Sequence, residues 1–231
     1  MTQMLKYYKG QFVEYEIYKL VDFYDSILRK PTIPFKFESL EDNKKAHYMA
    51  FSMAETLSEL GGLGLSANQI GLNVSVCAIN MGNEIWTMFN PEIIEHSLIP
   101  SAYQEGCLSY PGLYLKIPRW ETIKVKFQAI NGKYVLQEFS GLTAVCVQHE
   151  LDHLNGVLFT DKVSKIKLEQ AKRKVKNNLK KMKKMTVKSK EETKEIQPSN
   201  KIVEQQQTPQ IQILDSFAKI QQLPEKFVYK V

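Results

Sequence analysis

Two histidines and a glutamate near residue 150 have the spacing of a metal-binding helix. His149 and His153 are four positions apart, and Glu150 directly follows the first of them. Because an α-helix turns once about every 3.6 residues, side chains at i and i+4 lie on one face, so both imidazoles can bind one metal ion. Glu150 is one position after His149, so its side chain points to one side of the two imidazoles. From there its carboxylate can reach a metal-bound water without being a ligand. The chain has only four histidines, and this spacing favours a metal site over two incidental core histidines.

A cysteine in the middle of the chain is a candidate for the third ligand. Cys107 lies in the stretch Glu105-Gly106-Cys107-Leu108-Ser109. A lone cysteine is usually a small buried hydrophobe. Here its thiolate would join two imidazoles and leave one position of a tetrahedron open. That number of protein ligands is typical of a catalytic rather than a structural metal ion.

The remaining elements follow from apolar periodicity. Residues 40–60 repeat apolar side chains at three- and four-residue spacing, which predicts a helix capped by Ser39 or Asp42 and ended by Gly61-Gly62. Alternating patterns predict strands at 73–80, 84–89, 122–128 and 134–139, with a further short strand at 92–97. Residues 163–185 carry an imperfect apolar stripe under a dense lysine face, which predicts a basic amphipathic helix.

A glycine-rich segment, residues 62–71, follows the first predicted helix. Its alternating glycines allow the backbone to pass close to another group or a ligand. A phosphate-binding loop is not favoured, because G-K-[ST] is absent and the helix precedes the glycines. Gln69 ends the segment among apolar neighbours, and a buried amide requires hydrogen-bond partners.

Composition indicates a soluble globular protein in a reducing compartment. The 231 residues are 43% hydrophobic and 24% charged. The chain contains no apolar run of about 18 residues, so a membrane-spanning helix is not expected. The N-terminal residues resemble neither a secretory signal nor a transit peptide. Three cysteines are too few and too scattered for a disulfide framework. We therefore expect the cytoplasm as the location.

Positive charge is concentrated in one segment. Lys162–Lys190 contains 13 Lys or Arg and one acid, a net charge of +12, whereas the rest of the chain carries −6. A lysine-rich run is most often a solvated helix. A charge of this size attached to an acidic body also fits a polyanionic partner. Few aromatic residues interleave the lysines, so base-specific recognition and sequence-specific DNA binding are not expected.

Three stretches, GLGLSANQ (62–69), EGCLS (105–109) and QHELDH (148–153), resemble the signature motifs of the peptide deformylase family. They occur in the family's order, and the resemblance covers about residues 20–162. It implies an α+β fold in which antiparallel strands surround a central H-E-x-x-H metal helix. We expect an N-terminal extension at 1–20, a catalytic domain at 21–162, the basic helix at 163–185 and a low-complexity, disordered tail at 186–231.

The resemblance implies removal of the formyl group from N-formyl-methionyl nascent peptides, with release of formate. One divalent metal ion would be bound by Cys107, His149 and His153, often Fe²⁺ in the cell and replaceable by Zn²⁺, Ni²⁺ or Co²⁺. Glu150 would act as general base and then general acid. The Gln69 side chain and the Leu108 backbone N–H would stabilise the charge that develops on the formyl oxygen.

The resemblance also assigns residues that bind substrate or support the metal site. A methionine slot would be formed by Leu63, Leu142, Val145 and Cys146, with Tyr103 at its mouth. Gly64, Glu105 and Gly106 would hold the substrate backbone. Asp152 and Arg119 would pair and steady the metal helix. Two residues depart from the family pattern: Ser66 replaces an alanine, and Tyr114 stands where an arginine commonly grips the downstream peptide.

In bacterial deformylases a C-terminal helix docks on the ribosome near the exit tunnel, and Lys162–Lys190 lies in the equivalent place. The hypothesis is that this segment binds ribosomal RNA and brings the active site to emerging chains.

Two other functions share part of the pattern. A zinc metallopeptidase contains H-E-x-x-H but normally takes its third ligand downstream, and no histidine follows His153. A Cys107→Ser variant that kept metal and peptidase activity would favour it. The second alternative is a non-catalytic ribosome-binding protein on a deformylase-like core. The intact Glu150, Gln69 and three candidate ligands argue against that alternative.

Overall fold

The main body of the protein is a mixed α+β fold built on a five-stranded antiparallel sheet. The computed structural model describes residues 4–8 and 11–194. The sheet has the order β3-β4-β5-β8-β9, made of β3 (Gly64–Ser66), β4 (Val76–Asn80), β5 (Ile85–His96), β8 (Thr122–Gln128) and β9 (Tyr134–Ser140). Three short 3-10 helices, η1 (Ser26–Arg29), η2 (Ala67–Ile70) and η3 (Phe159–Lys162), connect these elements.

Helix α1 (Leu40–Leu60) packs on one face of the sheet and has the bounds that its periodicity predicted. The Ser39 hydroxyl accepts a hydrogen bond from the Asp42 backbone N–H, and Gly61 ends the helix with a φ of 63°. A side chain there would strain the left-handed backbone, so glycine suits this position.

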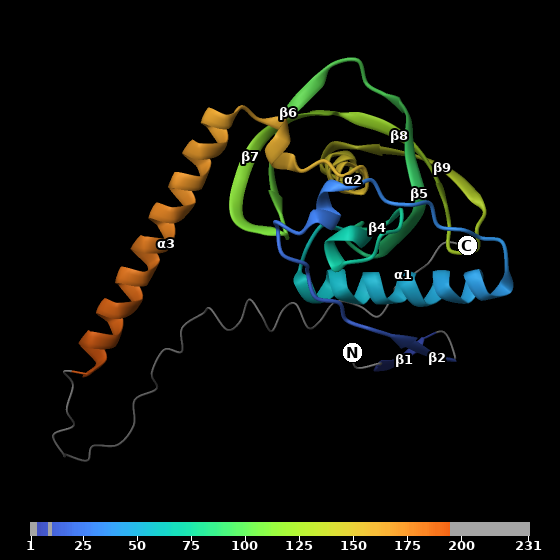
Figure 1. Cartoon of the computed structure of the whole chain (residues 1–231), viewed down its shortest axis with the longest axis horizontal. Helices are drawn as coiled ribbons and strands as arrows, with labels where there is room; N and C mark the ends of the chain where they lie inside the picture. Colours follow the sequence, from blue (N-terminus) through green and yellow to red (C-terminus); the bar gives the residue numbers. More distant parts are fainter. Residues whose placement is uncertain (1–3, 9–10, 195–231) are drawn as a thin grey trace, which may run out of the picture. The chain divides into compact units, whose positions relative to one another are not determined.

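Helix α2 (Gly141–Leu154) packs on the opposite face. Strand β4 shows how one sheet serves both helices: Val76 and Ala78 belong to the core cluster with α1, whereas Cys77 and Ile79 belong to the cluster with α2. Successive side chains of a strand point to opposite faces, so a near-continuous apolar run is required here. Seen almost end-on in Figure 1, α2 lies inside the ring formed by the surrounding strands.

A long hairpin completes that ring beside α2. It pairs β6 (Pro100–Cys107) with β7 (Tyr110–Trp120), and sequence analysis did not predict either strand. Prolines at 100, 111 and 118 and glycines at 106 and 112 interrupt this stretch, and both residue types are uncommon inside strands. The signal that was present is the alternation of Leu113, Leu115 and Ile117, which are buried while their neighbours are exposed.

Strand β5 differs from the two separate strands predicted at 84–89 and 92–97. It is one continuous strand with a register irregularity between Phe89 and Glu92. Asn90 has a φ of 50° there, a value that asparagine tolerates better than most residues. The irregularity also accommodates Pro91, which has no N–H to donate to a ladder.

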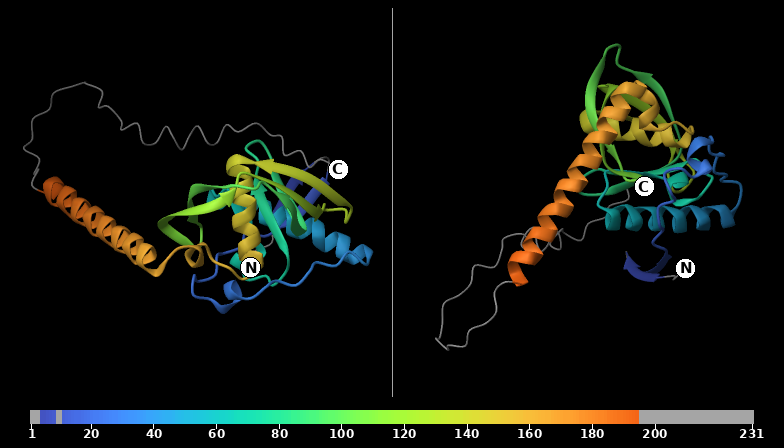
Figure 2. Two further views of the ribbon diagram at one scale, coloured as in Figure 1. Left: turned by 90° about the horizontal axis from the view of Figure 1, so that it is seen from above. Right: turned by 60° about the vertical axis from the view of Figure 1, so that its left-hand side comes forward.

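The N-terminal residues, for which no local structure was predicted, form a second hairpin, β1 (Met4–Tyr8) and β2 (Gln11–Tyr15). The right-hand view of Figure 2 shows it as a separate small ribbon. The chain that follows runs along α1, where the backbone N–H groups of Glu16 and Tyr18 donate to the hydroxyls of Ser52 and Thr56, each at 3.0 Å. These contacts satisfy two hydroxyls that are fully buried on α1.

Helix α3 spans Lys165–Lys194 and so continues past the predicted end at residue 185. The remainder of the predicted tail, residues 195–231, lies outside the described residues. Within the part of the chain that the structure describes, no helix is both long and apolar enough to span a membrane.

Candidate metal centre and substrate cavity

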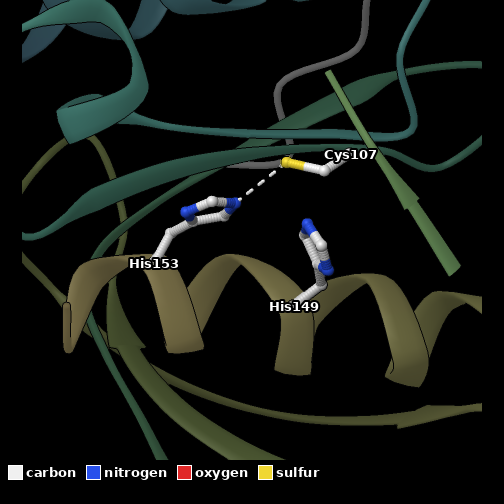
Figure 3. A group of neighbouring side chains, drawn as sticks. All are labelled: Cys107, His149 and His153. Atoms are coloured by element: carbon white, nitrogen blue, oxygen red, sulfur yellow. Dashed lines mark hydrogen bonds between the residues drawn. The ribbon is translucent and has the colours of Figure 1, made fainter. Parts of the chain in front are cut away.

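Cys107, His149 and His153 converge at one point between α2 and the end of β6. One ligand atom from each lies within 4.8 Å of the other two. The Cys107 Sγ is 3.2 Å from Nε2 of His153, and the two imidazole centroids are 4.9 Å apart. Figure 3 shows both rings rising from the same side of α2 toward the sulfur. The i, i+4 spacing predicted that the two histidines lie on the same side of the helix.

These three residues fit a divalent metal ion. Burial, followed by the charge on His149, holds the pKa of His153 well below its ordinary value, so that ring is neutral and keeps a lone pair for a metal. Within the described residues, Nδ1 of the same ring has no hydrogen-bond partner. A thiolate and two imidazoles form a donor set that suits Zn²⁺, Fe²⁺ and related ions.

A buried ion-pair network fixes the orientation of His149. Glu105 accepts two hydrogen bonds from Arg119, at 2.5 and 2.9 Å, and its Oε2 lies 3.0 Å from Nδ1 of His149. Arg119 also donates to Asp152 at 2.6 Å, and Asp152 pairs with Lys162 at 2.9 Å. Burial opposes ionisation of Glu105, but the hydrogen bonds from Arg119 and His149 outweigh it and keep the pKa of its carboxyl below the ordinary value.

This network changes what Glu105 can do. The resemblance assigned it to the substrate backbone, yet its carboxylate is occupied by Arg119 and His149 and is only 5% exposed. Its side chain therefore supports a metal ligand. Arg119, at 4% exposed, is not a solvated strand end, and its pairing with Asp152 joins β7 to α2.

Glu150 lies at the floor of the site and is 3% exposed. Burial raises the pKa of its carboxyl to about 7, although the charge of His149 and a hydrogen bond with Ser66 oppose the increase. Its Oε2 has no hydrogen-bond partner among the described residues. Gly64 makes room for this group, because a Cβ at Gly64 would overlap Oε1 of Glu150 and lie 2.7 Å from the Cys146 sulfur.

The amide of Gln69 is held in one orientation. Its Oε1 accepts hydrogen bonds from the backbone N–H and the hydroxyl of Ser66, both at 2.9 Å. Its Nε2 donates to the Ser109 hydroxyl at 3.0 Å and lies 3.6 Å from the Cys107 sulfur. The NH₂ group therefore points toward the three candidate metal ligands, as required of a donor to a reacting oxygen.

A cavity of about 430 Å³ opens over these groups. Leu63, Leu142, Val145 and Cys146 all line it, together with Gln69, Leu108, Gly64, Gly106 and Glu150. The residues around the cavity do not include Tyr103, whose hydroxyl instead donates to Glu121. Lining residues that sequence analysis did not assign are Gly62, Gln104, Pro111, Gly112, Leu113 and Tyr114. Most come from β6 and β7, whose strands it did not predict.

Comparison with known proteins identifies the family. A family model described as polypeptide deformylase matches residues 17–169. The chain belongs to the polypeptide deformylase family. It is therefore an enzyme, a metal-dependent hydrolase that removes the N-formyl group from nascent peptides.

Curated relatives and solved structures agree with this assignment. A peptide deformylase of Thermotoga maritima is 40% identical over 152 residues, covering 65% of this chain and 90% of the relative. One from Chromobacterium violaceum is 42% identical over 127 residues, covering 54% of this chain and 75% of the relative.

Two crystal structures are similar to the body of the protein. The Thermotoga maritima enzyme superposes with a TM-score of 0.60 at 38% identity, covering 64% of this chain and 99% of that one. The Synechococcus elongatus enzyme, in complex with actinonin, gives 0.61 at 34% identity, covering 68% and 85%. The antiparallel α+β architecture expected from the three motifs is confirmed.

Proposed function

We propose that deformylation takes place in this cavity on one divalent metal ion held by Cys107, His149 and His153. The convergence of these three side chains beneath the cavity carries the proposal. When bound, the ion would act as a Lewis acid and make water nucleophilic near neutral pH. We propose Fe²⁺ as the ion used in the cell, with Zn²⁺, Ni²⁺ or Co²⁺ able to replace it, because a mixed thiolate and imidazole set suits several divalent ions.

Glu150 moves the proton in this proposal. Its carboxylate accepts a proton from the attacking water and passes it to the amine that leaves when the formyl C–N bond breaks. A pKa of about 7, raised by burial, supports the role because a base works best when its pKa lies near the working pH. Since Oε2 has no partner among the described residues, it is free to take the proton.

Two hydrogen-bond donors stabilise the charge on the formyl oxygen. We assign this role to Nε2 of Gln69 and to the backbone N–H of Leu108. The fixed orientation of the Gln69 amide supports the assignment, because a pre-oriented donor costs no reorganisation during the reaction. Leu108 follows Cys107 directly in the chain and also lines the cavity.

The methionine side chain binds among Leu63, Leu142, Val145 and Cys146, which are the apolar residues on the α2 side of the cavity. We assign the substrate backbone to the backbones of Gly64 and Gly106, which line the cavity, while the space left by their missing side chains is filled by Glu150 and by the Tyr114 ring. Tyr103 has no part in this arrangement, since its hydroxyl bonds Glu121.

The test is formate release from formyl-Met-Ala-Ser by the protein loaded anaerobically with Fe²⁺. We expect the Glu150→Ala variant to lose activity by about 10²-fold or more while it binds the metal normally. Activity that survives the substitution would remove Glu150 from the reaction. A Glu14→Ala variant, which changes an exposed carboxylate outside the cavity, is the control.

The basic segment Lys162–Lys190 supports a second proposal: attachment to the ribosome through ribosomal RNA, in the cytoplasm. Its net charge of +12 supports it, because lysines that neutralise phosphates release counterions and bind strongly at low salt. Co-sedimentation with ribosomes should weaken steeply as salt rises. A chain ending at Lys162 that sediments equally well would contradict the proposal, and its retained deformylase activity would show that the truncated chain is folded.

A further inference from the structure

A chain of charged side chains leads from His149 to the surface of the protein. Glu105 contacts the ring of His149 and accepts hydrogen bonds from Arg119. Arg119 also donates to Asp152, and the last member is Lys162, whose Nζ lies 2.9 Å from Oδ1 of Asp152. The side chains of Arg119 and Glu105 are 3% and 4% exposed, whereas that of Lys162 is 32% exposed. The support of a candidate metal ligand therefore ends at a lysine that reaches solvent.

Asp152 divides its two carboxylate oxygens between two cations. Its Oδ2 accepts a hydrogen bond from Nη1 of Arg119 at 2.6 Å, and its Oδ1 contacts Lys162. Glu105 receives the rest of the guanidinium, with Nε 2.5 Å from Oε1 and Nη2 2.9 Å from Oε2. A carboxylate can bind two N–H groups of one guanidinium at once. If Lys162 were removed, both oxygens of Asp152 would be able to bind Arg119, and Asp152 would compete with Glu105 for Nη2.

The bond from Nη2 of Arg119 matters because its acceptor is shared. Oε2 of Glu105 accepts this bond and also lies 3.0 Å from Nδ1 of His149. A guanidinium drawn toward Asp152 would lengthen the first contact and displace the oxygen that makes the second. The partner of one ring nitrogen determines the orientation of an imidazole and how its other nitrogen meets a metal ion. A change at Asp152 would therefore reach His149.

The short helix that carries Lys162 is held in place by other contacts. Lys162 ends η3, and Phe159 begins it. The buried ring of Phe159 meets the imidazole of His149 edge to face, with the ring centroids 5.7 Å apart. Asp161 of the same helix pairs with Arg29 at 2.5 Å. Because these contacts do not involve the Lys162 ammonium, a substitution that removes its charge leaves η3 anchored beside the candidate metal centre.

We propose that Lys162 is a positioning residue for the candidate metal ligand His149. By holding one oxygen of Asp152, it keeps the Arg119 guanidinium turned toward Glu105. This inference rests on the proposed metal site. Lys162 neither lines the cavity nor belongs to the three candidate ligands, so it contributes to metal binding and not to proton transfer or peptide contact. It is also the first residue of the basic segment, so the charge network ends where that segment begins.

The experiment measures the affinity of the full chain for Co²⁺ by competition with a chromophoric chelator, together with the visible absorption of the bound ion, which depends on ligand geometry. We expect Lys162→Met, which keeps an unbranched apolar side chain, to bind Co²⁺ about 3- to 10-fold more weakly and to shift the absorption bands. This loss is smaller than the roughly 10- to 100-fold expected for a direct partner of a ligand. Lys162→Arg should restore both readouts, because it keeps a cation beside Asp152. Lys172→Met is the matched control, since that lysine pairs with Glu169 at 3.5 Å outside the network.

A double-mutant cycle tests the route from Lys162 to the ligand. The variant Lys162→Met/Glu105→Gln should bind Co²⁺ no more weakly than Glu105→Gln alone, because the route is already broken at Glu105. Additive losses would overturn the inference. Unchanged affinity and absorption in Lys162→Met would overturn it as well, and a lower urea midpoint in that variant would then assign the lysine to stability alone. If the unmodified protein bound no Co²⁺, the proposed metal site itself would be wrong, and this inference with it.

Discussion

Oε2 of Glu105 lies 3.0 Å from Nδ1 of His149, so a buried carboxylate on β6 fixes the orientation of a candidate metal-binding ring on α2. The same oxygen accepts a hydrogen bond from Arg119. The candidate metal centre is therefore supported by charged residues whose contacts cannot be predicted from sequence spacing alone.

Replacing Glu105 with Gln tests this support. We expect metal affinity to fall by about 10- to 100-fold, because His149 loses the anionic partner that fixes its tautomer and orientation. Arg119 would keep only Asp152 as a carboxylate partner, so the metal-free protein should also lose about 3–5 kcal/mol of unfolding free energy. Competition with a chromophoric chelator measures the first effect, and urea unfolding measures the second.

The matched control is Glu95→Gln, which removes a carboxylate whose exposed side chain pairs with Lys124 at 3.1 Å. A surface pair of this kind contributes about 0–1 kcal/mol, so neither metal affinity nor stability should change measurably. If both variants behave alike, the contact between Glu105 and His149 has no function in metal binding.

Substitution of Gly64 with Ala should displace the proposed catalytic carboxylate, that of Glu150, without removing it. The added methyl would overlap Oε1 of Glu150, so the carboxylate must move. A displacement of about 1 Å can reduce the rate by about 10²-fold, and we expect a loss of that order in kcat with normal metal content. The double variant Gly64→Ala/Glu150→Ala should be no worse than Glu150→Ala alone. Additive losses would show that the methyl acts elsewhere.

Gln69→Ala should lower kcat by about 10²–10³-fold, the usual effect of removing one donor to a developing oxyanion. Ser66→Ala removes the hydroxyl that donates to Oε1 of Gln69 and also hydrogen-bonds Glu150, whereas the backbone N–H of residue 66 remains. We therefore expect a smaller loss of about 3- to 10-fold. Gln104→Ala, on the exposed rim of the cavity, is the control. Steady-state kinetics on formyl-Met-Ala-Ser distinguish the three variants, and equal effects of Gln69→Ala and Gln104→Ala would contradict the assignment.

Alkaline pH should destabilise the protein through Tyr18. Burial, then the charges of Tyr48 and Glu16, raise the pKa of Tyr18 from its ordinary value of 10.0 to about 12. The folded state therefore keeps the phenol proton at pH values where the unfolded chain has lost it. By linkage, this contribution to stability is complete below pH 10 and decreases as the pH rises toward 12. Urea unfolding of Tyr18→Phe should show a weaker decrease over that interval, and identical slopes would exclude Tyr18 as the cause.

Local patterns in the sequence determined the parts of the site that lie on one element. The i, i+4 pair His149 and His153 shares a face because helical geometry is local, and α1 and β8 have their predicted bounds. The Cys107 assignment came from the ligand count and the family resemblance, since it is 42 positions from His149. No periodicity relates residues so far apart.

Tertiary structure decided which polar groups meet. The bonds from Glu105 to His149 and from Ser66 to Gln69, and the exclusion of Tyr103 from the cavity, depend on how β6 and β7 fold beside α2. Strand alternation gives the face on which a side chain lies but not its partner, because the partner is set by packing between elements distant in sequence. The sequence therefore determined the candidate reacting groups, and the packing of the hairpin against the helix determined their orientation.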